Sequence, residues 1–195
     1  MPLHANRYNN IIEYVHNNFC DNLLEIGVCK GHTSIEILRW SKNPSINFYG
    51  IDLFEDIDEE TFDKEVSIPA DSRATVETYL KNASLNINLF KGFSNKVVDE
   101  IENLDIQFDV IFIDGGHSYE TVKEDFYNYV KFLKPSGIVF FDDYTPEPGF
   151  GIKQLVDELI EAAKYNITID ERYTDTYRDY LFQIAKVTKK AQEDG

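Results

Sequence analysis

The sequence is poor in cysteine and has no long apolar run. Its two cysteines, Cys20 and Cys29, are too few for a disulfide framework, so we expect a reduced, cytoplasmic protein. No apolar run approaches the ~18 residues that span a bilayer. The N-terminus lacks the basic-then-apolar pattern of a signal peptide. These absences argue against a membrane partner and against a secretory route.

Basic residues are also scarce, because 19 Lys and Arg stand against 35 Asp and Glu, for a net charge of −16. Such a balance repels nucleic-acid phosphates unless bases gather in a patch. The nearest group of bases, Lys186 to Lys190, is interpreted as a solvated tail. We therefore expect no nucleic-acid partner and favour a small molecule, while homo-oligomerisation stays open.

The composition fits one globular α/β domain. With 195 residues, 43% of them hydrophobic, the chain can bury one core, so we expect a single domain over 1–195. Apolar strand segments alternate with helical patterns five times, which predicts a doubly wound sheet. The expected parallel strands are 23–27, 47–52, 87–90, 108–113 and 138–141. Two more strands near 166–171 and 179–187, joined by a turn at 173–177, predict a seven-stranded, Rossmann-like sheet with a C-terminal antiparallel hairpin.

Helical spacing of apolar residues predicts the elements that connect the strands. An amphipathic helix over 6–18 occupies the N-terminal segment 1–20. Further helices are expected at 72–82, near 95–103, and after His117, the last ending at Pro135-Ser136-Gly137. Two further helices are expected. One turns Ile35, Leu38 and Trp40 inward, and the other, after a loop at 145–151, contains Leu155, Val156, Leu159 and Ile160.

The segment 54–71 follows neither pattern. It is acidic, weakly periodic and interrupted by Pro69, which predicts a long loop with one helical turn. Loops of this length in compact domains are often lids or binding loops, so one interpretation is a lid over a site. A surface insertion is the equally supported alternative.

Acidic residues end several of the expected strands. The buried strand 108–113 leads into Asp114 and, after two glycines, His117, at the edge where open α/β sheets bind ligands. Other acids at or near strand ends are Glu25, Asp52 and the pair Asp142-Asp143. A single acid there is often only a helix cap. Carboxylates at four strand ends on one edge of the sheet repel each other, which indicates that a cation lies among them.

The loop after the first strand has the spacing Glu25-x-Gly27-x-x-x-Gly31-x-Thr33, which departs from the dinucleotide-binding form G-x-G-x-x-G. Together with Asp52 and the terminal hairpin, this motif resembles the class I S-adenosylmethionine-dependent methyltransferases over nearly the whole chain. The resemblance implies that Gly27 and Gly31 belong to the cofactor loop.

The same resemblance implies roles for side chains along the sheet edge. Asp52 would hold the ribose hydroxyls and Thr33 the methionine carboxylate, with Glu25 near the methionine part of S-adenosylmethionine. Ser94 and Asn95 fall where the family contacts the adenine.

Two segments carry a closer resemblance: 112–119 and 137–144. They are similar to the metal-dependent small-molecule O-methyltransferases of the catechol and macrocin types. That resemblance implies that Asp114, Asp142 and Asp143 bind Mg²⁺ (or Mn²⁺), with Asp114 also beside the cofactor. It implies that His117 is the general base.

The chain departs from the catechol type at two positions. Catechol enzymes have Lys where this chain has His117, and Asn where it has Asp143. Both departures are closer to the sugar-modifying branch, which favours a sugar or another aliphatic hydroxyl as the methyl acceptor.

The chemistry of these residues agrees with that assignment. Carboxylates without a nearby cysteine favour a hard, oxygen-preferring cation, which would acidify the acceptor hydroxyl. His117, with an ordinary pKa near ~6.5, is suited to accept the proton, although it can also be a helix-flanking residue bonded to backbone. Alternatives for the whole chain are a metal-free methyltransferase, a nucleotide-binding oxidoreductase and a non-catalytic ligand-binding module.

Overall fold

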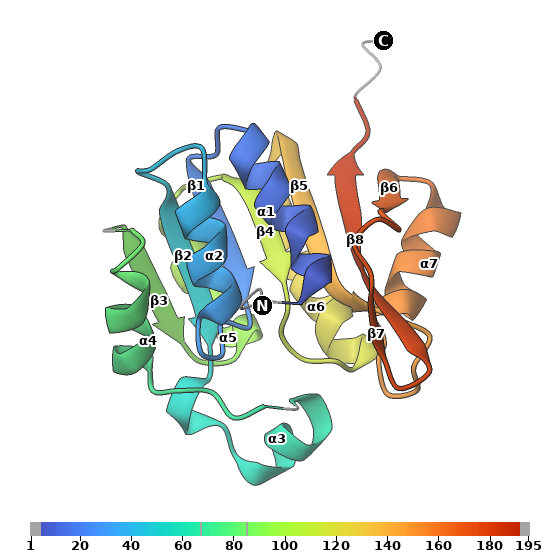
Figure 1. The fold of residues 1–195 in the computed structure, drawn as a ribbon, viewed down its shortest axis with the longest axis horizontal. Coiled ribbons are helices and arrows are strands. Elements are labelled where there is room, and N and C mark those ends of the chain that lie inside the picture. Colours follow the sequence, from blue (N-terminus) through green and yellow to red (C-terminus); the bar gives the residue numbers. More distant parts are fainter. Residues whose placement is uncertain (1–4, 67, 85, 192–195) are drawn as a thin grey trace.

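The computed structural model describes residues 5–66, 68–84 and 86–191, which fold around one mixed sheet (Figure 1). Its strand order is β3-β2-β1-β4-β5-β8-β6, and β7 pairs with β8. The strands are β1 (Asn22–Ile26), β2 (Asn47–Asp52), β3 (Ile87–Lys91), β4 (Phe108–Ile113), β5 (Leu133–Tyr144), β6 (Tyr165–Ile169), β7 (Asp175–Tyr177) and β8 (Tyr180–Lys189). Strands β1 to β5 pair in parallel, and β8 is antiparallel to β5, β6 and β7. This confirms the predicted doubly wound sheet with antiparallel C-terminal strands.

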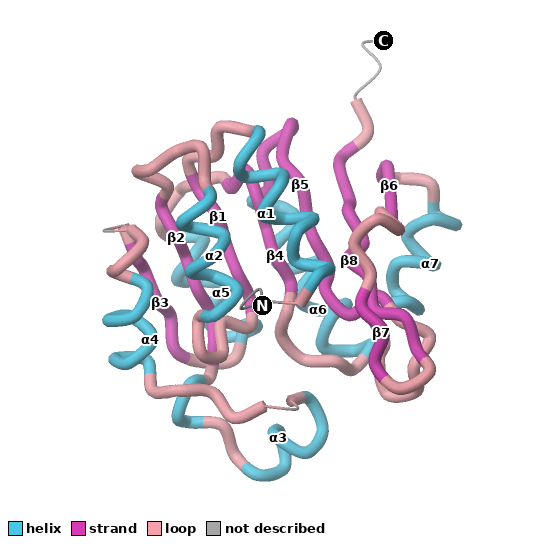
Figure 2. The backbone as a smooth tube through the Cα atoms, viewed as in Figure 1, coloured by secondary structure: helices cyan, strands magenta, loops and turns pink. Residues whose placement is uncertain are grey.

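Helices cover both faces of the sheet (Figure 2). They are α1 (Asn9–Asn17), α2 (His32–Trp40), α3 (Glu59–Glu65), α4 (Arg73–Leu80), α5 (Ser94–Glu102), α6 (Tyr119–Tyr129) and α7 (Ile152–Ala162), with short 3-10 turns η1 (Asn6–Tyr8), η2 (Phe54–Asp56) and η3 (Val130–Phe132). Buried side chains of α1, α2 and α4 join one apolar cluster, and those of α5, α6 and α7 join a second.

Strand periodicity explains why there are two cores. Neighbouring residues of a strand point to opposite faces, so in β1 Leu23 belongs to the first cluster and Leu24 to the second. Both are fully buried. No helix in the described part of the chain has the length and apolar character to cross a membrane.

Several boundaries differ from the sequence predictions. The helix after His117 ends at Tyr129, and Pro135 to Gly137 lie inside β5, in an irregular stretch where the register against β4 shifts. A bulge tolerates a proline in a strand because no ladder hydrogen bond is needed from it. The expected turn at 173–177 contains the short strand β7, which makes eight strands in the described residues.

One side chain that was expected to face the sheet is exposed. Trp40 is 54% exposed because it is two residues, or about 200° of helix, beyond the buried Leu38. Ile160 is 50% exposed, about 100° around α7 from the buried Leu159. Leu155 and Val156 of the same helix are fully buried.

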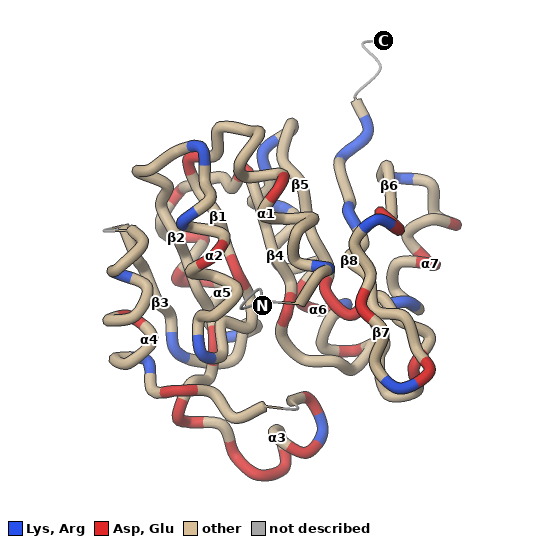
Figure 3. The backbone as a smooth tube through the Cα atoms, in the orientation of Figure 1, with Lys and Arg blue, Asp and Glu red and all other residues tan. Residues whose placement is uncertain are grey.

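The acidic segment 54–71 is more ordered than a loop with one helical turn. It contains the turn η2 and the two-turn helix α3, whose first residue follows the N-cap Asp58. The Asp58 carboxylate accepts a hydrogen bond from the Thr61 backbone N–H at 2.7 Å. Acidic residues dominate this segment, as the red stretches around α3 in Figure 3 show.

Candidate active site

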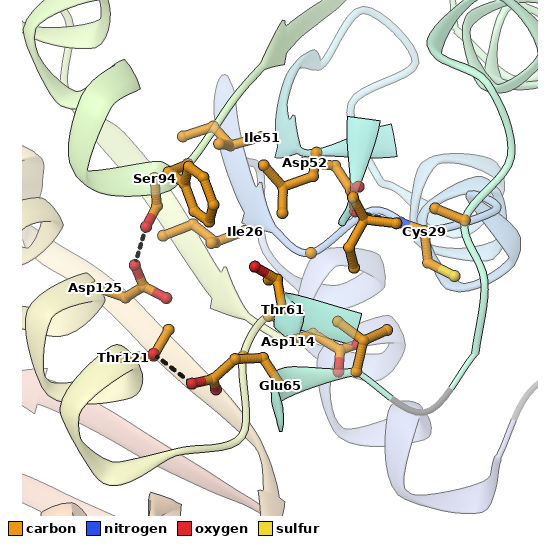
Figure 4. Close-up of a pocket in the computed structure, with 18 of the residues that line it drawn as sticks. Ile26, Cys29, Ile51, Asp52, Thr61, Glu65, Ser94, Asp114, Thr121 and Asp125 are labelled. Atoms are coloured by element: carbon orange, nitrogen blue, oxygen red, sulfur yellow. Dashed lines mark hydrogen bonds between the residues drawn. The ribbon is translucent and has the colours of Figure 1, made fainter. Parts of the chain in front are cut away.

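Two adjoining cavities open where β1, β2 and β4 end. The first, of about 370 Å³, is lined by Asp52, Ser94 and Asp125 and is here called the Asp52 cavity (Figure 4). The second, of about 330 Å³, is lined by His117 among others and is here called the His117 cavity. Both cavities share a set of lining residues: Gly27, Cys29, Glu65, Val66, Ile68, Asp114 and Gly115.

The loop after β1 borders both cavities and requires glycine. Gly27 has φ +92°, and a Cβ there would lie 2.0 Å from the Asp114 carbonyl oxygen. The Asp114 N–H in turn donates to the Ile26 carbonyl oxygen at 2.8 Å. Gly31 also has a positive φ, +72°, immediately before α2. Gly27 therefore lets the ends of β1 and β4 approach each other directly, and Gly31 provides the left-handed residue from which α2 begins.

Asp52 fixes this loop as well as lining a cavity. One carboxylate oxygen accepts the Cys29 backbone N–H at 2.8 Å, and the other accepts the Phe54 N–H at 2.5 Å. Cys29 itself has φ +53°, a left-handed conformation that this hydrogen bond stabilises. A carboxylate oxygen has more than one lone pair, so both oxygens can still accept from a ligand.

Glu25 and Thr33 both line the His117 cavity. Glu25 is 1% exposed, and burial raises its pKa to about 8. Its Oε2 atom has no hydrogen-bond partner. A buried carboxylate with an unused oxygen is a costly group unless a donor pairs with it.

The predicted adenine residues separate in the structure. Ser94 lines the Asp52 cavity, and its hydroxyl donates a short hydrogen bond to the Asp125 carboxylate (Figure 4). Asn95 is not among the lining residues; its amide donates to Glu124 at 3.1 Å. Asp125, on the inner side of α6, lines the cavity, and burial raises its pKa to about 7.

The carboxylates of Asp114, Asp142 and Asp143 converge, and we call these three residues the acidic centre. Their nearest oxygens lie within 4.8 Å of one another. Consecutive strand residues normally point to opposite faces, yet both β5 aspartates reach the centre. The register between β5 and β8 shifts between Phe141 and Tyr144, and Asp143 has φ +51°. This bulge turns both side chains the same way.

A cation from the other end of the chain lies against this centre. The Arg7 guanidinium donates from Nε to Asp142 Oδ1 at 2.6 Å and from Nη2 to Asp142 Oδ2 at 2.9 Å. Nη2 also donates to Asp143 at 3.1 Å. The Tyr8 hydroxyl donates to Asp142 at 2.9 Å. The sequence predicted a cation among these carboxylates but gave no signal to select Arg7 from 19 bases.

The three carboxyl groups of the acidic centre differ in pKa and therefore in charge. Burial would raise the pKa of Asp142, but the Arg7 guanidinium outweighs burial and lowers it below the ordinary value. Burial and the neighbouring Asp142 raise the pKa of Asp143 to about 8 and hold that of Asp114 well above its usual range. Asp142 is therefore the ionised member that Arg7 pairs with at neutral pH.

His117 lies beside the acidic centre. Its Nε2 is 3.4 Å from Asp143, and its ring packs on Phe150 with centroids 4.6 Å apart. Burial lowers the pKa of His117, which favours the neutral imidazole at pH 7. Its carbonyl oxygen accepts from the Gly151 N–H at 2.7 Å. The backbone of His117 is thus structural, while its ring faces the cavity side.

Helix α3 and the residues after it form one wall of both cavities, through Glu65 and Val66 among others. The Glu65 carboxylate accepts the Ser118 backbone N–H at 2.9 Å. It also accepts the Thr121 hydroxyl at 3.2 Å (Figure 4). No sequence pattern identifies Glu65, Arg7 or Tyr8, because each acts through a contact distant in the sequence.

Comparisons with known proteins agree with this geometry. A family model for a methyltransferase domain matches residues 24–144. An uncharacterised protein of Acanthamoeba polyphaga mimivirus is 28% identical over 164 residues, which are 80% of this chain and 69% of that protein. A longer protein of Sinorhizobium fredii is 38% identical over 72 residues, which are 36% of this chain and 8% of that protein.

Solved O-methyltransferases share the fold. TomG from Streptomyces achromogenes, solved with S-adenosylmethionine, has a TM-score of 0.66 at 17% identity, covering 93% of this chain and 79% of its own. The Bacillus cereus O-methyltransferase solved with S-adenosylhomocysteine has a TM-score of 0.66 at 19% identity, and the match covers 93% of this chain and 80% of the Bacillus cereus chain. MycE of the mycinamycin pathway, solved with Mg and S-adenosylhomocysteine, has a TM-score of 0.57 at 21% identity, covering 96% of this chain and 50% of MycE.

Proposed function

Because the chain belongs to the family of methyltransferase domains, we propose that it transfers the methyl group of S-adenosylmethionine to a hydroxyl of a small molecule. The observation that carries this proposal is the pair of joined cavities at one sheet edge. One holds groups suited to a nucleoside, and the other holds a neutral histidine beside converging carboxylates. The same family membership removes the support for a nucleotide-binding oxidoreductase.

The cofactor is assigned to both cavities. The adenosine part would occupy the Asp52 cavity. Asp52 would bind its ribose hydroxyls, and its adenine would lie near Ser94, with Asn95 behind Ser94. The methionine part would reach past Gly27 and Gly31 into the His117 cavity. There Glu25 would pair with its ammonium and Thr33 with its carboxylate, while Asp114 borders both parts. The unused Oε2 of buried Glu25 supports that pairing.

His117 is proposed as the general base. Nε2 would take the proton from the acceptor hydroxyl, and a neutral ring at pH 7 is in the form that can do so. The acceptor oxygen then forms a bond to the methyl carbon as the bond from sulfur to that carbon breaks, and S-adenosylhomocysteine leaves. The sheet edge would contribute mainly by holding the two reactants in line.

A divalent ion fits the chemistry of the acidic centre. Asp114, Asp142 and Asp143 offer a set of hard oxygen donors, which suits Mg²⁺ or Mn²⁺. When bound there, such an ion would act as a Lewis acid toward the acceptor hydroxyl. MycE, a relative in fold, holds Mg in its structure.

The acceptor is proposed to be a sugar or another polyhydroxylated molecule rather than a nucleic acid. MycE has been solved with mycinamycin VI, a small molecule. The acidic segment before and within α3, which borders both cavities, would repel a phosphate backbone (Figure 3). The unpaired thiols of Cys20 and Cys29 support a reducing, cytoplasmic location.

One observation favours a second candidate, a metal-free methyltransferase of the same fold. The Arg7 guanidinium already compensates Asp142 and Asp143. In that case Arg7 would be the resident cation of the centre, and the carboxylates would orient Arg7, Tyr8 and His117 rather than hold an ion.

Calorimetry and a methyl-transfer assay test these proposals together. We expect S-adenosylhomocysteine to bind tightly and NAD not to bind; tight NAD binding without S-adenosylhomocysteine binding would contradict a methyltransferase. The assay follows S-adenosylhomocysteine release with sugars and polyhydroxylated natural products as acceptors. Activity lost with EDTA, restored by Mg²⁺ and absent in Asp142→Asn supports the metal-dependent form. Activity that survives both changes selects the metal-free form.

A further inference from the structure

Arg7 is held in place from two sides. Its side chain meets the acidic centre, and its backbone N–H and that of Asn6 donate to the Asp175 carboxylate on β7, each at 2.9 Å. The guanidinium Nη1 lies 3.4 Å from the same carboxylate, and its Cζ lies 5.8 Å from the centroid of the Phe182 ring. The turn η1 is therefore clamped between the end of β5 and the β7–β8 hairpin.

Arg7 engages the same oxygens that a divalent ion would use. Both oxygens of Asp142 accept from the guanidinium, and Oδ2 also accepts from Tyr8. One oxygen of Asp143 accepts from Nη2. An ion bound ~2.1 Å from an Asp142 oxygen would lie within about 5 Å of the guanidinium nitrogens on that oxygen. Two cations this close in a buried site repel each other strongly.

We propose that Arg7 and a divalent ion are alternative occupants of the acidic centre, so that Arg7 is the residue that sets its affinity for metal. The inference rests on the proposed metal site. In the ion-free form, Arg7 stabilises the converging carboxylates. To load the ion, the guanidinium leaves Asp142 and Asp143, and the η1 turn loosens from Asp175. Without Arg7 the carboxylates have lost their compensating cation, and their attraction for a divalent ion increases.

Mn²⁺ binding, followed by electron paramagnetic resonance of free Mn²⁺, tests the proposal without requiring an acceptor. Arg7→Gln removes the charge and keeps a polar side chain. Arg39→Gln is the matched control, since it removes the same charge from α2, where Arg39 pairs with Glu36 at 2.9 Å. We expect Arg7→Gln to bind Mn²⁺ at least about tenfold more tightly than the wild type, a change of about 1.4 kcal/mol. Arg39→Gln should match the wild type.

Asp142→Asn separates the two ways in which this test can fail. Equal Mn²⁺ affinity in the wild type and Arg7→Gln, with binding lost in Asp142→Asn, would overturn the exchange but leave the metal site standing. Absence of Mn²⁺ binding from every protein, Arg7→Gln included, would overturn the metal site and the exchange together. Binding of S-adenosylhomocysteine would still report on the methyltransferase proposal by itself.

A measurement on the wild type keeps the proposal testable even if Arg7→Gln folds poorly. The amide protons of Asn6 and Arg7, which Asp175 holds, should exchange with deuterium faster at saturating Mn²⁺ than without it. A peptide from the β2 strand should be unaffected. Mn²⁺ that binds without changing exchange at residues 6 and 7 would show that Arg7 stays in place, which overturns the proposal.

Discussion

The carboxylate of Glu65, the last residue of α3, accepts a hydrogen bond from the backbone N–H of Ser118, the N-cap of α6, at 2.9 Å. This bond joins the acidic segment 54–71 to the residue that follows His117. The N-terminus of a helix carries unpaired N–H groups and a partial positive charge, so a carboxylate there is stabilised. Burial alone would raise the pKa of Glu65, but hydrogen bonds from Ser118, Lys64 and Thr121 outweigh burial and lower it.

We predict that Glu65→Ala loosens α3 and weakens cofactor binding. Losing a partly buried carboxylate at a helix N-terminus should cost about 1–2 kcal/mol of stability. The dissociation constant for S-adenosylhomocysteine should rise by about tenfold, because α3 lines both cavities. Calorimetry gives the affinity, and hydrogen exchange over 59–66 reports the loosening.

Glu59→Ala is the control for this change, since Glu59 is an exposed residue at the start of the same helix. It should leave both affinity and exchange close to the wild type. If Glu65→Ala and Glu59→Ala behave alike, the segment is a surface insertion and not a lid. Exchange at 59–66 that does not slow when S-adenosylhomocysteine binds to the wild type would lead to the same conclusion.

We predict that His117→Asn abolishes most of the chemistry while leaving the cofactor bound. Removal of a general base typically lowers a rate by ~10²–10⁴. The dissociation constant for S-adenosylhomocysteine should change little. His16→Asn, at the far side of α1 where His16 contacts the Trp40 carbonyl, is the control and should keep full activity. Equal losses in both variants, or wild-type activity in His117→Asn, would exclude the base role.

The meeting of Asp114 with Asp142 and Asp143 could be predicted because parallel strands end at one edge of a sheet. The pattern of apolar segments gave the strands, and adjacent β4 and β5 bring their ends together. The geometry that makes Asp142 and Asp143 point the same way could not be predicted. It depends on a register shift against β8, which the sequence of β5 alone does not reveal.

The contact of Arg7 with the acidic centre could not be predicted from sequence patterns, for a related reason. Its contact with Asp142 spans 135 residues and exists only because the η1 turn lies against the end of β5 and the β7–β8 hairpin. Local periodicity predicted the helix but says nothing about which side chain at its start meets which strand. The helix α3 was missed because its pattern is acidic and short, and it is stabilised by its cap at Asp58 and the distant contact of Glu65.

We predict that cofactor binding releases a proton from Glu25. Burial raises its pKa to about 8, so most of it is protonated at pH 7 in the free protein. Pairing with an ammonium group favours the carboxylate and lowers that pKa, so a proton leaves on binding. Calorimetry of S-adenosylhomocysteine at pH 7 in buffers of different ionisation enthalpy should show this release, and it should shrink by pH 9. Glu25→Gln should abolish it; an unchanged release in that variant would assign the proton elsewhere.

We predict that Asp125→Asn changes how stability depends on pH. Burial raises the pKa of Asp125 from 3.8 to about 7. Between these values the folded state binds a proton that the unfolded chain has lost, so the stability of the wild type falls as pH rises through this window and then levels off. From pH 5 to pH 7 this one group accounts for a loss of roughly 2 kcal/mol. Asparagine carries no charge and can still accept from Ser94, so the variant lacks this loss.

Urea unfolding at pH 5, 7 and 8.5 should therefore show the stability of Asp125→Asn rising relative to the wild type. Asp99→Asn, on the exposed side of α5, should follow the wild-type profile. Parallel profiles for the wild type and Asp125→Asn would mean that Asp125 is ionised in the folded protein throughout, and the Asp52 cavity would then carry a fixed negative charge beside Ser94.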